Sequence, residues 1–204
     1  MRAVFLDRDG VLNREVGNLS RVEQLQLLPG VSGAVRKLNE LDIPVIVVTN
    51  QSAVGRGLCS EAELGEIHVA LAELLAAGGA SVARFCYCPH HPTEGIGPYR
   101  MECECRKPKP GMLRQAAKDL GIDLTRSAIV GDHLSDLQAG WTAGCRTVLV
   151  TTGHGLETRK SLAGHPRQPG HIADGLAGAV DWILDSFESA GDGVSVASGR
   201  RPEL

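Results

Sequence analysis

Residues 3–10 read AVFLDRDG, an apolar run of four residues that passes directly into two carboxylates and a glycine. An apolar run of this length, without polar alternation, predicts a strand that is covered on both faces, as in a parallel sheet. Acidic side chains that come directly after such a strand lie at the carboxyl edge of the sheet, where open α/β sheets bind their ligands. This stretch therefore predicts both a sheet and the place of a site on it.

Strand-length apolar runs recur along the chain and alternate with helical patterns. The further predicted strands cover residues 43–48, 82–87, 128–130 and 147–150. Apolar residues at spacings of three and four predict helices over residues 31–41, 61–77, 111–120, 135–142 and 174–187. This alternation predicts an α/β fold, a doubly wound parallel sheet with right-handed crossovers.

The segments between these elements indicate one domain. Neither the stretch between Asp9 and Thr49 nor the stretch between Thr49 and Lys107 is long enough for a large separate cap domain. Residues 188–204 are rich in glycine, serine and charge, a composition that disfavours a packed core. We therefore predict a single domain over residues 1–187, followed by a disordered tail over residues 188–204.

The composition excludes several classes of protein. With a formal net charge of −3 and no cluster of Lys and Arg, the chain offers no surface for nucleic acid or an anionic membrane. The longest apolar run, residues 43–48, is too short to span a bilayer. The acidic motif begins at Asp7, which leaves no room for a signal peptide, so we expect a cytoplasmic protein. Nothing in the sequence indicates an obligate interface, and we expect a monomer.

Polar residues of several kinds follow the predicted strands and would meet at one edge of the sheet. Thr49 follows the second strand, Asp132 follows the fourth, and Lys107 precedes the helix that begins near residue 111. Carboxylates gathered in this way repel one another and require a cation. An oxygen-only set of ligands suits Mg²⁺, which binds one or two carboxylates together with waters and a substrate phosphate. Ligand type and abundance favour Mg²⁺ over Mn²⁺.

These residues supply the parts that phosphoryl transfer needs. Asp7 can attack phosphorus, and Asp9, two residues on, can face the same way and protonate the leaving group. Thr49 can hydrogen-bond a phosphate oxygen, and Lys107 can screen the charge between nucleophile and phosphate. The alternative interpretation gives these Asp residues turn or helix-cap roles. Asp136 keeps three possible roles, which are binding the metal through water, orienting Lys107 and capping the next helix.

Four of the six cysteines lie in one predicted loop, residues 86–110. Three of them and a histidine form the pattern Cys-x-His-x12-Cys-x-Cys, a full tetrahedral set for a structural Zn²⁺ ion; its members are Cys88, His90, Cys103 and Cys105. His91 can replace His90 as a ligand, and without a metal the cysteines would be free thiols or an oxidised pair. A long loop without a regular pattern is unusual unless something ties it down. Zinc would do so, and would position Arg106 and Lys107.

The motifs together carry a resemblance. Asp7-x-Asp9-Gly10, Thr49-Asn50, Lys107 and Gly131-Asp132-x3-Asp136 resemble the four motifs of the haloacid dehalogenase superfamily, over residues 1–155. The resemblance implies a Rossmann-like sheet, a nucleophile at the first Asp, and a general acid and base at the second, whose backbone carbonyl also binds Mg²⁺. It thus implies Asp7, Asp9 and Asp132 as magnesium ligands. An Asp at the second position is typical of the phosphatase and mutase branches.

The cysteine loop narrows this resemblance. A zinc insert that ends in Cys-x-Cys-Arg-Lys-Pro, with Asp-Arg-Asp-Gly near the start, is similar to the group of histidinol phosphatases and heptose-bisphosphate phosphatases. The long gap before Cys-x-Cys is similar to the heptose enzymes, which remove the 7-phosphate and leave the 1-phosphate. The same likeness favours His90 over His91 as the zinc ligand. The substrate-binding residues that it implies are Arg8, Glu15, Gly17, Asn18, Thr49, Asn50, Gln51, Ser52, Arg106, Lys107 and His133.

Two departures from the group leave the sugar open. Residues 15–20 lack the usual Gly-Tyr-Val pattern, and residues 53–55 stand where a glycine usually follows Ser52. His133 stands where a lysine is frequent, and its two interpretations are an altered contact with phosphate and a side chain that only faces solvent. Histidinol phosphate or another small sugar phosphate therefore stays an alternative substrate, and so does either anomer at C1. A phosphomutase is disfavoured, because mutases need a cap that keeps water from the aspartyl-phosphate. An inactive zinc-stapled binding module predicts a broken nucleophile or acid, whereas both aspartates are present.

Overall fold

The computed structural model describes residues 1–189, and residues 190–204 lie outside the described part. Six parallel strands form one sheet in the order β3-β2-β1-β4-β5-β6. Their bounds are β1 Val4–Leu6, β2 Val45–Asn50, β3 Arg84–Cys88, β4 Ala128–Gly131, β5 Arg146–Val150 and β6 His171–Ala173. The order of the strands reverses at β1, as in a doubly wound sheet, so the predicted fold class is confirmed.

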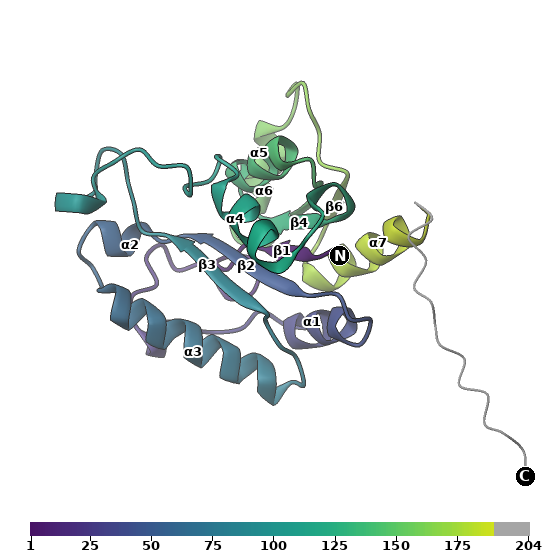
Figure 1. Ribbon diagram of the computed structural model, residues 1–204, viewed down its shortest axis with the longest axis horizontal. Helices are drawn as coiled ribbons and strands as arrows, with labels where there is room; N and C mark the ends of the chain where they lie inside the picture. The colour runs from purple at the N-terminus through teal and green to yellow at the C-terminus, as the bar shows by residue number, and fades with distance from the viewer. Residues whose placement is uncertain (190–204) are drawn as a thin grey trace, which may run out of the picture.

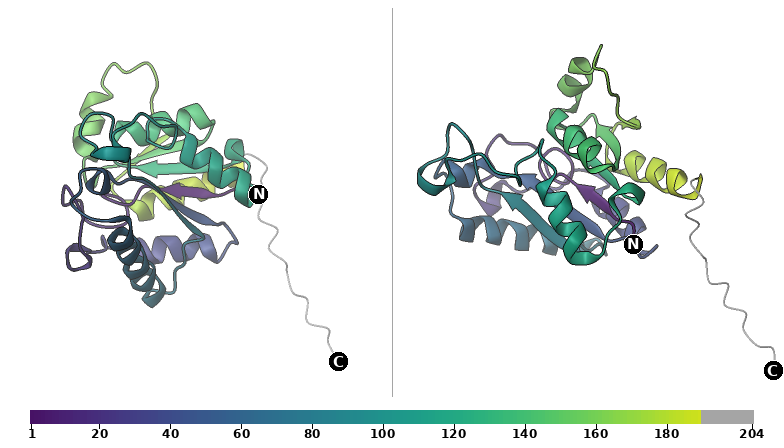
Figure 2. Two further views of the ribbon diagram at one scale, coloured as in Figure 1. Left: turned by 60° about the vertical axis from the view of Figure 1, so that its left-hand side comes forward. Right: turned by 45° about the horizontal axis from the view of Figure 1, so that its top comes forward.

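Helices cover both faces of this sheet (Figures 1 and 2). Val35, Leu71 and Ile183, from α1, α3 and α7, belong to one buried core. Leu113 and Ala139, from α4 and α5, belong to a second core on the other face. The bounds are α1 Val31–Asn39, α2 Ser52–Gly55, α3 Glu61–Ala77, α4 Gly111–Leu120, α5 Leu134–Ala143, α6 Gly155–Ser161 and α7 Leu176–Ser189, with short 3₁₀ turns at Val22–Gln24, Gly97–Tyr99 and Leu124–Arg126.

Strand β1 shows why the apolar run at the start of the sequence has no polar alternation. Val4 and Leu6 pack into the core that contains α1 and α7, whereas Phe5 packs into the core that contains α4. All three side chains are fully buried, because β1 lies in the middle of the sheet between β2 and β4. The strand ends directly before Asp7, which therefore leaves the sheet at its carboxyl edge.

The five predicted strands and five predicted helices are present, with ends shifted by a few residues. The short elements α2, α6 and β6 were not predicted. No segment within residues 1–189 forms a separate cap domain, as predicted. Helix α7 ends at Ser189, two residues inside the predicted tail, and the rest of that tail prediction concerns residues outside the described part.

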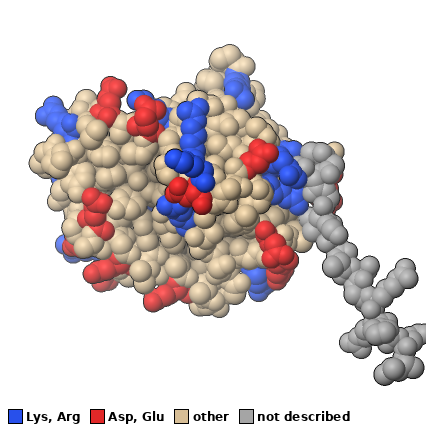
Figure 3. All heavy atoms as spheres, viewed as in Figure 1, with Lys and Arg blue, Asp and Glu red and all other residues tan. Residues whose placement is uncertain are grey.

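None of the helices within residues 1–189 is long and apolar enough to cross a bilayer. On the face that Figure 3 shows, basic and acidic side chains are interspersed among uncharged ones. This face presents no large field of a single sign.

Candidate active site

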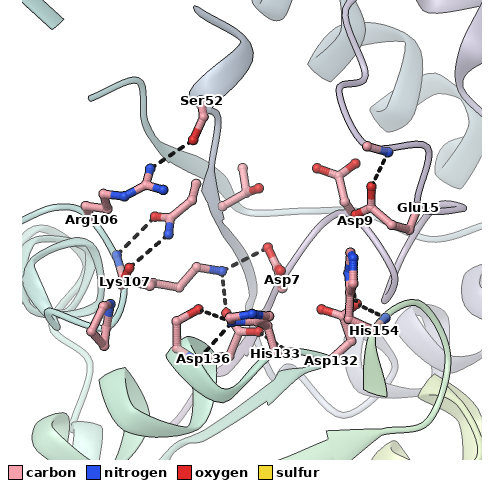
Figure 4. Close-up of a pocket in the computed structure, with 15 residues that line it drawn as sticks. Asp7, Asp9, Glu15, Ser52, Arg106, Lys107, Asp132, His133, Asp136 and His154 are labelled. Atoms are coloured by element: carbon pink, nitrogen blue, oxygen red, sulfur yellow. Dashed lines mark hydrogen bonds and ion pairs between the residues drawn. The ribbon is translucent and has the colours of Figure 1, made fainter. Parts of the chain in front are cut away.

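A cavity of about 420 Å³ opens at the carboxyl edge of the sheet (Figure 4). Loops that follow β1, β2, β4 and β5 line it, together with the segment that precedes α4. The lining residues are Asp7, Asp9, Glu15, Gly17, Thr49, Asn50, Ser52, Arg106, Lys107, Pro108, Asp132, His133, Ser135, Asp136 and His154. Most residues of the predicted site therefore meet in one place. Asn18 and Gln51 line a smaller adjoining cavity instead.

Lys107 lines this cavity and is almost fully buried, at 3% exposed. Its Nζ is 2.9 Å from Asp7 Oδ1 and 2.6 Å from Asp136 Oδ1, and it donates a hydrogen bond of 2.8 Å to the carbonyl oxygen of Val48. Asp136 Oδ2 also accepts a hydrogen bond from the backbone N–H of His133, at the start of α5. Two of the three roles left open for Asp136, orienting Lys107 and capping the helix, thus correspond to observed contacts.

The carboxylates around Lys107 carry more negative charge than the lysine can balance. Asp7, Asp132 and Asp136 each offer an oxygen within 4.8 Å of the others. Burial raises the pKa of Asp7 to about 7 even though Lys107 favours its charged form. Burial, followed by repulsion from Asp7 and Asp136, raises the pKa of Asp132 to about 8. The pKa of Lys107 is raised as well, because its two carboxylate partners outweigh the cost of burial.

This donor set fits a magnesium ion. Its oxygens are hard ligands and they are crowded, and the raised pKa values of Asp7 and Asp132 indicate that a further cation would favour the ionised form of these two carboxylates. The carboxylates of Asp7 and Asp132 belong to the group, as the sequence predicts. Asp9 enters the predicted set only through its backbone carbonyl.

The side chain of Asp9 is engaged by a buried arginine. Arg8 is fully buried, and its Nη2 donates hydrogen bonds of 3.0 and 2.8 Å to the two oxygens of Asp9. Asn13 and Gln51 each donate a further hydrogen bond of 2.9 Å to this carboxylate. Although burial alone would raise the pKa of Asp9, the charge of Arg8 and these hydrogen bonds hold it below its usual value.

The predicted role of Arg8 in binding substrate does not match its contacts in this structure. Its guanidinium is buried, where it also donates to Gln51 Oε1 at 3.0 Å and lies 3.4 Å from His68 Nε2. It does not line the cavity, because the residue between two inward-facing aspartates turns its side chain to the opposite side. In this structure Arg8 therefore holds Asp9 and does not line the cavity.

His68 in α3 provides a test of how stability depends on pH. Burial, followed by repulsion from Arg8, lowers its pKa from 6.5 to about 4. Below pH 6.5 the unfolded chain therefore binds a proton at this position that the folded protein does not, so the protein becomes less stable as the pH is lowered. Between pH 7 and pH 5 we expect the free energy of unfolding of the unchanged chain to fall by about 2 kcal/mol more than that of His68→Gln, measured by urea unfolding. Equal losses in the two proteins would contradict this.

The four predicted zinc ligands also come together. The Sγ atoms of Cys88, Cys103 and Cys105 are 3.1–3.4 Å apart, and His90 Nδ1 is 3.5–3.7 Å from Cys105 and Cys88. Sulfurs at these separations are not disulfide-bonded, and a tetrahedral Zn²⁺ ion with bonds of about 2.3 Å spaces its ligands by similar distances. The set therefore fits zinc. His91 Nδ1 instead accepts a hydrogen bond from the backbone of Glu94, so His90 is the residue placed as a ligand.

The zinc loop connects this cluster to the cavity. Arg106 follows Cys105 directly, and its Nη1 donates hydrogen bonds to the carbonyl oxygen of His90 at 2.9 Å and to Ser52 Oγ at 3.0 Å. On the outer side, Tyr99 donates a hydrogen bond of 2.7 Å to Glu61 at the start of α3. The loop therefore sets the position of Arg106 at the cavity wall.

Sequence reasoning missed the loop after β5. His154 lines the cavity, and its backbone N–H donates a hydrogen bond of 2.8 Å to Asp132 Oδ2. A signal is present in the sequence, because residues 151–154 are polar or glycine and follow an apolar strand directly. No acidic residue follows this strand, however, so its end resembles an ordinary turn.

A parallel sheet with Asp7 after β1, Thr49 in β2, Lys107 before α4 and Asp132 after β4 defines a phosphatase of the haloacid dehalogenase superfamily. A family model described as HAD-hydrolase-like matches residues 104–179. A D-glycero-D-manno-heptose-1,7-bisphosphate 7-phosphatase from Thermosynechococcus vestitus is 44% identical over 185 residues, which cover 89% of this chain and 94% of that protein. The chain therefore belongs to the family of D-glycero-D-manno-heptose-1,7-bisphosphate 7-phosphatases.

Two further comparisons support this relationship. A D-glycero-β-D-manno-heptose-1,7-bisphosphate 7-phosphatase from Yersinia pestis is 37% identical, over 91% of this chain and 90% of that protein. The crystal structure of a D,D-heptose 1,7-bisphosphate phosphatase from B. bronchiseptica, complexed with magnesium and phosphate, matches with a TM-score of 0.82 and 36% identity. The match covers 91% of this chain and 99% of that one.

Proposed function

We propose that the chain hydrolyses the 7-phosphate of a D-glycero-D-manno-heptose 1,7-bisphosphate with Mg²⁺, through an aspartyl-phosphate on Asp7. The observation that carries the proposal is the buried contact of Asp7 with Lys107, beside Asp132, at the bottom of the cavity. Membership of the family supports the substrate, and the magnesium and phosphate bound to the B. bronchiseptica enzyme support the cofactor and the reaction.

The chemistry follows from the positions of four side chains. Asp7 forms a bond to phosphorus while the bond from phosphorus to the sugar oxygen breaks, and Asp9 donates a proton to that oxygen. Asp9 then takes a proton from water as the water attacks phosphorus, which releases phosphate and restores Asp7. Lys107 balances the charge of Asp7, and Thr49 can donate a hydrogen bond to a phosphate oxygen. Mg²⁺, held by Asp7, Asp132 and the carbonyl of Asp9, would neutralise charge on the phosphate.

The contacts of Asp9 add a condition to this scheme. All of its hydrogen-bond partners are donors, so the carboxylate is ionised as long as Arg8 and Gln51 hold it. Protonation therefore requires the side chain to rotate away from Arg8 toward the leaving oxygen.

Substitution Asp9→Asn tests the role of this residue as an acid. We expect kcat to fall about 10²- to 10⁴-fold for a sugar phosphate, whose alkoxide leaving group needs a proton. For p-nitrophenyl phosphate, whose leaving group is stable without a proton, the loss in the first chemical step should be much smaller. Rapid-quench measurement of the first turnover compares the two substrates, and equal losses would show that Asp9 is not the acid.

A substrate with two phosphates fits the charges of the cavity. Lys107 and Arg106 are the two permanently cationic side chains among the described residues that line it. Arg106 lies across the cavity from Asp9 and Glu15 (Figure 4), where its guanidinium already contacts Ser52. We infer that Arg106 and Ser52 bind the phosphate that is not hydrolysed. We also infer that Glu15 and Asn50 form hydrogen bonds with the sugar hydroxyls.

The experiment that tests the function compares three substrates under identical conditions with Mg²⁺. They are the α and β anomers of D-glycero-D-manno-heptose 1,7-bisphosphate and histidinol phosphate. A heptose bisphosphate preferred by orders of magnitude in kcat/KM supports the proposal, and the preferred anomer is then assigned. Preference for histidinol phosphate would contradict the proposed substrate but not the proposed aspartyl-phosphate mechanism.

We also propose that one copy of the chain, with its catalytic unit in residues 1–187, is sufficient for activity. In support, every residue to which these proposals give a catalytic, magnesium-binding or substrate-binding role lines a single cavity of one chain. Size-exclusion chromatography with light scattering, at the concentration of the assay, measures the active species. Activity found only in a dimer fraction would contradict the monomer.

A further inference from the structure

The loop between β5 and α6, residues 151–154, lies against the residues at the ends of β1 and β4. Thr152 Oγ1 donates a hydrogen bond of 2.5 Å to the carbonyl oxygen of Gly10. The backbone N–H of His154 donates a hydrogen bond of 2.8 Å to Asp132 Oδ2. The loop therefore contacts both the segment that follows Asp7 and the carboxylate that follows β4.

Two glycines allow this close approach. Gly10 and Gly153 have φ values of +79° and +54°, and a Cβ placed on either would lie 2.1 Å from Asp132 Oδ2. Such a separation is well inside van der Waals contact, so any side chain at either position would displace the carboxylate. Asp132 Oδ2 is thus enclosed by Gly10, Gly153 and the N–H of His154, and Asp132 is only 2% exposed.

The loop is itself fixed from its other side. The backbone N–H of Thr151 donates a hydrogen bond of 2.9 Å to the carbonyl oxygen of Ala173 in β6, and the N–H of Gly155 donates one of 2.8 Å to Thr152. The contact with Asp132 therefore comes from backbone that strands β5 and β6 hold in place. The imidazole of His154 contributes less, because its Nδ1 is 3.6 Å from Asp132 Oδ2 and the side chain is half exposed.

We propose that Thr152, Gly153 and the backbone N–H of His154 are positioning residues for the magnesium site, and that they act by fixing the orientation of the Asp132 carboxylate. The inference rests on the proposed function. A hydrogen bond to Oδ2 sets the rotation of the carboxylate about its Cβ–Cγ bond, and this in turn sets the direction of the second oxygen. Mg²⁺ requires near-octahedral geometry with short bonds, so an incorrectly oriented ligand lowers its affinity. Loss of a hydrogen bond that orients a ligand costs about 10- to 100-fold in metal affinity.

The test measures Mg²⁺ affinity without turnover, from the dependence of Tm on Mg²⁺ concentration. Thr152→Val keeps the shape of the side chain and removes the hydroxyl, and we expect the Mg²⁺ dissociation constant to rise about tenfold. Thr152→Ser restores the hydroxyl and should stay within about twofold of the unchanged chain. Thr142→Val is the matched control, because Thr142 Oγ1 also donates to a backbone carbonyl, at 2.8 Å, but within α5.

A second pair of variants acts on the backbone donor. His154→Pro removes the N–H that bonds Asp132, whereas His154→Ala keeps it, so only the proline variant should bind Mg²⁺ about tenfold more weakly than its partner. Folding of each variant is checked from its Tm without Mg²⁺. Normal Mg²⁺ affinity in a folded Thr152→Val or His154→Pro would overturn the inference while leaving the proposed function in place. An unchanged chain that binds no Mg²⁺ would overturn both. A chain that binds Mg²⁺ but hydrolyses no heptose bisphosphate would overturn only the substrate.

Discussion

Asp7→Asn is expected to lower the rate of phosphate release at least about 10⁴-fold, because an amide cannot form the bond to phosphorus that starts the reaction. The substitution is nearly isosteric and removes a charge whose burial is costly, as the raised pKa of Asp7 indicates. We therefore expect the Tm in the absence of Mg²⁺ to be unchanged or higher. Phosphate release and thermal unfolding, measured on the same preparation, give both values.

The two measurements together show whether inactivity of Asp7→Asn is caused by unfolding. A variant that unfolds early and is inactive would say nothing of the nucleophile, whereas a stable inactive variant identifies it. Incubation of the unchanged chain with substrate followed by rapid acid quench should show phosphate bound to Asp7 by mass spectrometry. Turnover above about 1% of normal in a folded Asp7→Asn protein would contradict an aspartyl-phosphate at this residue.

Loss of the zinc site should lower both the zinc content and the activity of the protein. Cys105→Ser removes one of the four ligands, and we expect less than about 0.1 equivalent of zinc per chain by elemental analysis. Cys105 directly precedes Arg106, whose contacts with His90 and Ser52 depend on the course of this loop. We expect kcat/KM for the bisphosphate to fall at least about tenfold, mainly through a higher KM, because the chemical groups around Asp7 are retained.

Cys86→Ser is the control for this substitution. Cys86 lies in β3 two residues before Cys88, outside the cluster of metal ligands. This variant should keep one equivalent of zinc and nearly normal kinetics. Full zinc content in Cys105→Ser, or loss of zinc in Cys86→Ser, would show that the ligand set was assigned incorrectly.

The sequence predicts most of the sheet because its central strands are buried on both faces. Residues 3–6 and 45–48 are continuous apolar runs for this reason, and each leads to polar residues at one edge. Strand β6, His171–Ala173, was missed because three residues with a histidine give no periodicity to detect. The three cysteine ligands of the zinc set could be predicted from their spacing, whereas the choice of His90 over His91 came from the resemblance.

The orientation of single side chains could not be predicted. Arg8 lies between two residues of the cavity, yet its guanidinium is buried beneath it, because the backbone alternates direction after β1. The sequence equally hides the role of His154, whose backbone rather than its imidazole contacts Asp132 most closely. Such contacts depend on how loops from different strands pack against one another, and a local sequence pattern does not predict that packing.

The central place of β1 in the sheet has a consequence for synthesis on the ribosome. Among the six strands of this sheet β1 is translated first, whereas its neighbour β4 begins at Ala128. At about 5–20 residues per second, Val4–Leu6 emerges on the order of 10 s before β4 can pair with it. During that interval only β2 is available to pair with one edge of β1, and its opposite edge is open to incorrect partners. Codon changes that slow translation between β3 and β4 should therefore lower the yield of soluble protein.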